Sequence, residues 1–202
     1  GCGAGLDLIL AAEKVGPTGR VIGVDASEEM LPLAKTNLER AGVADRVELR
    51  QGLIEALPVE DQSVDWVISN CVINLSVDKP AVFREIKRVL KPGGTAVISD
   101  IVAENLPHWV RDHSDLYSAC VSGAVSEQRY LELAGEAGLA DAGITARLTY
   151  DESMVRAMVS DALPIDVDAI AQCLEMSPDD LLDLAAKDLA GSLSSVRFSF
   201  TG

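Results

Sequence analysis

The sequence is poor in basic residues, in histidine and in aromatic residues. Its 202 residues include 17 Lys and Arg against 32 Asp and Glu, which gives a formal net charge of −15 and a pI near 4.4. Proteins that bind nucleic acid or anionic membranes usually present a basic stripe or patch, and no cluster of Lys and Arg is found here. The composition therefore argues against nucleic acid and membrane surfaces as partners.

Long apolar runs and paired cysteines are also missing. No stretch approaches the ~20 apolar residues that span a membrane, and no charged segment followed by an apolar one stands at the start. The four cysteines, Cys2, Cys71, Cys120 and Cys173, form no CxxC pair and no disulfide-scaffold spacing. Because free thiols of this kind suit a reducing compartment, we expect a cytoplasmic protein.

An alternation of strand and helix patterns fills most of the chain. Apolar runs predict strands at 20–25, 46–50, 64–69 and 94–99, and helical patterns lie between and beyond them at 6–15, 28–41, 79–90 and 126–137. Groups of Gly and Pro, at 91–94 for example, fall where a helix must stop and the chain must turn into a strand. This rhythm predicts a doubly wound α/β fold with a mostly parallel sheet.

The pattern becomes helical near the C-terminus before one last strand. Ser177 followed by Pro178 predicts a capped helix, and an alternating apolar run after it predicts a closing strand. We therefore expect a main domain over residues 1–150. Residues 151–202 would complete the same unit, with a helical insertion over 151–195 ahead of the closing strand.

The chain opens on a glycine-rich turn that is followed by an acid at a strand end. Gly1, Gly3 and Gly5 alternate with small residues, and Asp25 ends the apolar run that comes next. Such glycines let a ligand approach bare backbone, while an acid at the end of the next strand can accept hydrogen bonds from ribose hydroxyls. This order predicts a nucleotide-type cofactor site. The strand expected ahead of Gly1 lies outside the 202 residues, so we expect the sequence to be truncated at its N-terminus.

Taken together, the glycine turn, Asp25, Asp65 and the segments 57–58 and 90–94 resemble the class I S-adenosylmethionine-dependent methyltransferases over roughly residues 1–150. That resemblance implies a Rossmann-like fold and S-adenosylmethionine as the cofactor. Two further segments narrow the resemblance to one family within that class. The segments around Cys71 (69–75) and around Cys120 (117–124) look like those of the arsenite methyltransferases.

The resemblance also implies which residues surround the cofactor. They are spread over strand ends and the turns that follow them: Gly1, Gly3, Gly5, Asp25, Met30, Ile54, Glu55 and Asn70. The glycines would approach the methionyl part, the aspartate would hold the ribose hydroxyls and the methionine would pack beside the adenine. Because Leu53 stands where many relatives carry an acid, recognition of the adenine edge would rest on Ile54, Glu55 and backbone groups.

Cys71 and Cys120 are implied as the catalytic residues and as the ligands of arsenic, which is the substrate. Trivalent arsenic is thiophilic and carries a lone pair that can attack a methyl sulfonium, so the reaction needs no general base. Cys71 follows a strand at the carboxyl edge of the sheet, where such folds bind ligands, and Cys120 would converge on it from a covering segment. The family places a further cysteine, which can form a disulfide with one of these two, upstream of the glycine turn.

The leading prediction is methyl transfer from S-adenosylmethionine to arsenite or methylarsenite, with glutathione or thioredoxin as thiol reductant. Two alternatives stay open. Cys71 and Cys120 could simply pack in the interior, as we expect for Cys2 and Cys173, in an enzyme that methylates carbon or oxygen of a quinone or sterol-like acceptor. The chain could also be a thiol–metalloid binding module without turnover.

Overall fold

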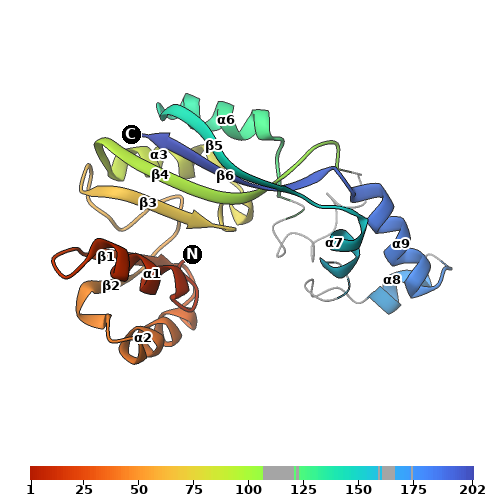
Figure 1. The fold of residues 1–202 in the computed structure, drawn as a ribbon, viewed down its shortest axis with the longest axis horizontal. Helices are drawn as coiled ribbons and strands as arrows, with labels where there is room; N and C mark the ends of the chain where they lie inside the picture. The colour runs from red at the N-terminus through yellow and green to blue at the C-terminus, as the bar shows by residue number, and fades with distance from the viewer. Residues whose placement is uncertain (107–120, 122, 159, 161–166, 174) are drawn as a thin grey trace.

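Two parallel strands and two helices form the amino-terminal part of the computed structural model, which describes residues 1–106, 121, 123–158, 160, 167–173 and 175–202 (Figure 1). Helix α1 (Leu6–Val15) follows the glycine turn, and helix α2 (Met30–Arg40) connects the paired strands β1 (Val21–Asp25) and β2 (Val47–Gln51). A 3₁₀ turn (Ala44–Arg46) precedes β2. The two helices and the loop after α2 bury an apolar cluster against this sheet: Leu8, Ala12, Leu38 and Val43.

Four strands form the second sheet, in the order β3-β4-β6-β5. Strand β3 (Val64–Asn70) runs parallel to β4 (Leu90–Ala103), whereas β6 (Leu193–Thr201) is antiparallel to both β4 and β5 (Ala140–Thr149). A 3₁₀ turn (Ile73–Leu75) follows β3.

Helices α3 (Lys79–Val89) and α6 (Glu127–Glu136) pack on one face of the four-stranded sheet (Figure 1). Aromatic rings fill this core. The ring of Tyr130 stacks on that of Phe198 with centroids 4.6 Å apart and meets Phe83 edge-on at 5.2 Å. Contacts of this geometry add to the stabilisation that burial of the rings provides.

In the described part of the connection between β5 and β6, three helices gather at the end of the molecule away from β1 and β2 (Figure 1). They are α7 (Glu152–Ala157), α8 (Val167–Cys173) and α9 (Pro178–Leu189). Ser177 caps α9 as predicted, since its hydroxyl accepts a hydrogen bond from the backbone N–H of Asp180 at 3.1 Å. The division of the chain at residue 150 stays a prediction.

The predicted fold class is confirmed, but the structure differs from the predicted pattern at the start of β4. Strand β4 already begins at Leu90, because the predicted turn at 91–94 is an irregular stretch within the strand, in which the N–H of Gly93 donates to the carbonyl of Gly202 at 2.9 Å. The strands form two separate sheets, because β1 and β3 are not hydrogen-bonded to each other.

Candidate functional site

The carboxyl ends of β1 and β3 meet at the glycine turn. A methyl group placed on Gly1 would lie 3.1 Å from the Val72 side chain and 3.6 Å from Oδ2 of Asp25. Gly3 and Gly5 have φ angles of 50° and 92°, which glycine adopts without the penalty that other residues carry. The turn therefore presents bare backbone between the ends of two strands.

Asp25 ties this turn to the end of β1. Its side chain is buried, with Oδ2 accepting a hydrogen bond from the N–H of Gly3 at 2.7 Å and Oδ1 accepting one from the N–H of Ser27 at 2.9 Å. Each carboxylate oxygen can accept a second hydrogen bond. The arrangement is compatible with the predicted ribose contact, which stays a prediction.

The other predicted cofactor residues lie at neighbouring strand and helix ends. Met30 begins α2, where its N–H donates to the hydroxyl of Ser27 at 3.3 Å, and its side chain is exposed. Glu55 accepts a short hydrogen bond from the hydroxyl of Ser76. Ile54 and Asn70 line one cavity together with Gly1. The structure thus brings Gly1, Ile54 and Asn70 to one cavity and ties Glu55 to the loop after β3.

Cys71 stands directly after β3 in a backbone conformation that is rare for residues other than glycine. Its φ is 52°, and its N–H donates to the carbonyl of Ser99 on β4 at 2.9 Å. Partial burial of the thiol raises the pKa of Cys71 above its ordinary value, and the negative charge of Asp100 raises it further. Cys120 lies outside the described residues, so its convergence on Cys71 stays a prediction.

Asp100 is a buried acid beneath this loop that the sequence patterns did not single out. Its Oδ1 accepts hydrogen bonds from Nδ2 of Asn74 and from the N–H of Ile101, both at 3.0 Å, and its Oδ2 accepts one from the Tyr130 hydroxyl at 3.3 Å. Burial raises the pKa of Asp100 to about 6, and these hydrogen bonds partly oppose the rise. One signal in the sequence was available, because Asp100, together with Ser99, interrupts an otherwise apolar run.

No group of three or more His, Cys, Asp and Glu side chains in the described ranges could hold a metal ion. Nor is any helix in this part of the chain long and apolar enough to cross a membrane.

The family model of a methyltransferase domain matches residues 1–138. An arsenite methyltransferase of Halobacterium salinarum is 46% identical over 139 residues, which are 68% of this chain and 35% of that protein. A demethylmenaquinone methyltransferase of Listeria welshimeri is 38% identical over 108 residues, covering 54% of this chain and 45% of that protein.

A solved structure gives a likeness over the whole chain. The arsenic(III) S-adenosylmethionine methyltransferase of Chlamydomonas reinhardtii superposes with a TM-score of 0.74 at 31% identity, covering 100% of this chain and 62% of that one. The chain thus spans less than half the length of the two curated relatives and somewhat less than two thirds of this solved structure.

Proposed function

Because this chain belongs to the methyltransferase-domain family, we propose that it takes part in transferring a methyl group from S-adenosylmethionine to thiolate-bound trivalent arsenic. One observation carries the proposal. Cys71 directly precedes Val72, and Val72 is the residue that lies against Gly1 of the glycine turn. This adjacency supports the proposal that the soft ligand and the cofactor turn belong to one site.

The residues at the turn fit the cofactor. Bare backbone at Gly1 leaves the room that a side chain would fill, and the Asp25 carboxylate keeps acceptor capacity for hydroxyl groups. When bound, S-adenosylmethionine supplies a methyl group on a positively charged sulfur, open to attack by the arsenic lone pair. The role of the chain is then to hold the arsenic atom and the methyl group in line and close together.

Cys71 can bind arsenic without first losing its proton. Arsenite carries hydroxyl groups, so each arsenic–sulfur bond replaces an arsenic–oxygen bond while the thiol proton leaves with the hydroxide as water. The raised pKa of Cys71 is therefore no obstacle to binding. Cys120 would supply a second thiolate to the same arsenic.

The methylated arsenic is formally pentavalent, so a trivalent product requires two electrons. Two thiols supply these two electrons when they are oxidised to a disulfide. We assign this reducing step to a thiol reductant of the glutathione or thioredoxin kind. A reducing, cytoplasmic setting would keep the Cys71 thiol reduced for the next turnover.

A second candidate is methylation of a quinone carbon, which the 38% identity to a demethylmenaquinone methyltransferase favours. In that case the acceptor is an organic ring, and Cys71 contributes packing alone. The two candidates differ in what they predict for serine variants, because serine cannot replace a thiolate on arsenic but fills nearly the same volume.

The test is arsenic-speciation mass spectrometry after incubation of the chain with arsenite, S-adenosylmethionine and glutathione. We expect methylated arsenic from the parent chain and from Cys173→Ser, a matched control on helix α8, and none above background from Cys71→Ser or Cys120→Ser. Product that persists in the Cys71→Ser, Cys120→Ser double variant would contradict the proposal. Arsenite binding without turnover of the cofactor would favour a binding module instead.

A further inference from the structure

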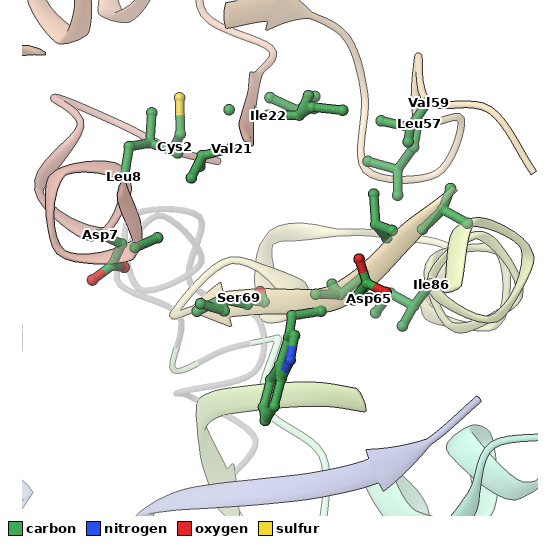
Figure 2. Close-up of a pocket in the computed structure, with 18 of the residues that line it drawn as sticks. Cys2, Asp7, Leu8, Val21, Ile22, Leu57, Val59, Asp65, Ser69 and Ile86 are labelled. Carbon is green, nitrogen blue, oxygen red and sulfur yellow. The ribbon is translucent and has the colours of Figure 1, made fainter. Parts of the chain in front are cut away.

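A second hollow lies beside the cavity at the glycine turn and differs from it in chemistry. The cavity that contains Gly1 has a volume of about 530 Å³ and is lined mostly by apolar side chains, among them Val21 and Ile22 (Figure 2). The second hollow has a volume of about 300 Å³ and is lined mainly by polar residues, so we call it the polar hollow. Asn70, which directly precedes Cys71, lines both. The polar hollow therefore adjoins the cavity at the glycine turn.

A row of residues from four neighbouring strands lines the polar hollow. Asn70 of β3 is paired in register with Ser99 of β4. Beyond it, Ser99 pairs with Arg197 of β6, and Arg197 pairs with Ala146 of β5. Phe198, the next residue after Arg197, is fully buried in the core beneath α3 and α6. Because successive residues of a strand face opposite sides of a sheet, the row of Arg197 lies on the face away from these helices.

Arg197 brings a positive charge to this row. Its Nε donates a hydrogen bond to Oγ of Ser99 at 3.2 Å, and no carboxylate of the described residues forms an ion pair with its guanidinium group. The nearby Arg147, by contrast, is paired with Glu127 of α6. A guanidinium group has five N–H donors, so the two terminal nitrogens of Arg197 can still donate to a ligand. The Ser99 hydroxyl can donate too, because it accepts from Arg197 through a lone pair.

These donors suit the carboxylate of a small molecule. The parallel N–H groups of a guanidinium group match the two oxygens of a carboxylate, and such charge-assisted hydrogen bonds are strong. Because the chain has a formal net charge of −15, it repels anions in general, and an anionic ligand requires a local cation. Arsenous acid is uncharged near neutral pH and has no such requirement, whereas glutathione carries carboxylates. A volume of about 300 Å³ is that of a small-molecule site.

We propose that the polar hollow binds a carboxylate of a small thiol reductant such as glutathione, through Arg197 and Ser99, and so holds the reductant's thiol beside Cys71. This role of Arg197 rests on the proposed function, in which a thiol reductant supplies two electrons. The N–H of Cys71 donates to the carbonyl of Ser99 at 2.9 Å, so the segment that carries the arsenic ligand is joined directly to the polar hollow. Binding of the carboxylate makes and breaks no covalent bond, and Arg197 thus selects the reductant without taking part in the chemistry.

The first test is an NMR titration of the whole chain with S-methylglutathione, which keeps the carboxylates of glutathione but has no free thiol. We expect saturable shifts of the backbone amides of Ser99, Ala146 and Arg197, and a dissociation constant that rises by roughly tenfold or more in Arg197→Gln. Arg197→Lys should give an intermediate value, because lysine keeps the charge but lacks the paired donors. The matched control is Arg40→Gln, which removes an exposed charge from α2 and should leave the dissociation constant unchanged.

The second test compares glutathione with dithiothreitol, an uncharged thiol, as the reductant in arsenite methylation. We expect Arg197→Gln to raise the KM for glutathione far more than the KM for dithiothreitol.

Three results would overturn the proposal. They are the absence of saturable shifts with S-methylglutathione, equal changes in KM for the two thiols, and shifts that acetate reproduces at the same concentrations, which would indicate a general anion site. If the parent chain methylates no arsenic with either thiol, the proposed function fails, and the titration still decides whether Arg197 binds the carboxylate of glutathione.

Discussion

Asp100 is an acid that the fold keeps away from water, at the carboxyl end of β4 and close to Cys71. Its side chain is fully buried, and the pKa rises from 3.8 to about 6 because burial disfavours the charged form. A raised pKa contributes stability that is fully present below about pH 4 and is lost as the pH rises through about 6. A shift of this size corresponds to about 3 kcal/mol of unfolding free energy.

The Asp100→Asn variant should lose this dependence on pH. An asparagine oxygen can still accept from Asn74 and Ile101, and its NH₂ group can donate to the hydroxyl oxygen of Tyr130, so the hydrogen bonds survive without a charge. We expect the variant to be more stable than the parent at pH 7.5 and little different at pH 4, as measured by urea unfolding at both values.

The matched control is Asp65→Asn, an exposed acid paired with Lys91 on the surface, which should shift stability by no more than about 0.5 kcal/mol. If the free energy of unfolding of Asp100→Asn differed between pH 7.5 and pH 4 as much as that of the parent chain, another group would be the cause of the pH dependence. The sequence could not predict this environment, because Tyr130 lies 30 residues from Asp100 and the burial arises only when α6 packs on the sheet.

At the scale of elements, local chemistry fixes where helix α3 begins. Oδ1 of Asp78 accepts a hydrogen bond from the N–H of Ala81 at 2.9 Å, which satisfies one of the free donors at the helix start. Asp78→Ala should lower the free energy of unfolding by about 1 kcal/mol. Denaturant unfolding measures this, with Asp45→Ala, an exposed acid in the 3₁₀ turn before β2, as control. Equal losses in the two variants would contradict the capping role.

Element boundaries were predictable where they depend on local signals. Helix α1 has the predicted bounds, and α3 and α9 begin directly after their capping residues, because capping involves residues close in sequence. Strand β4 runs longer than predicted, through Ala103, because its far end pairs with Leu193 of β6, some ninety residues along the chain. Pairing between residues so far apart in the sequence produces no local sequence pattern from which it could be predicted.

At the scale of the whole molecule, the ends of β1 and β3 come together at the glycine turn. This brings the turn close to the segment that carries the Cys71 thiol. The sequence alone predicted the α/β class and placed Gly1, Asp25 and Cys71 in one site by resemblance, and the comparisons confirm the methyltransferase family. The contact between Gly1 and Val72 was not predictable, since it depends on how the two sheets face each other.

The central claim is that the Cys71 thiol binds arsenic beside the glycine turn. X-ray absorption spectroscopy of the chain loaded with arsenite counts the sulfur atoms bonded to arsenic. We predict one arsenic–sulfur bond fewer in Cys71→Ser than in the parent chain, and an unchanged count in Cys173→Ser. An identical sulfur count in the parent and Cys71→Ser would contradict the claim and leave Cys71 as a packing residue of an enzyme with an organic acceptor.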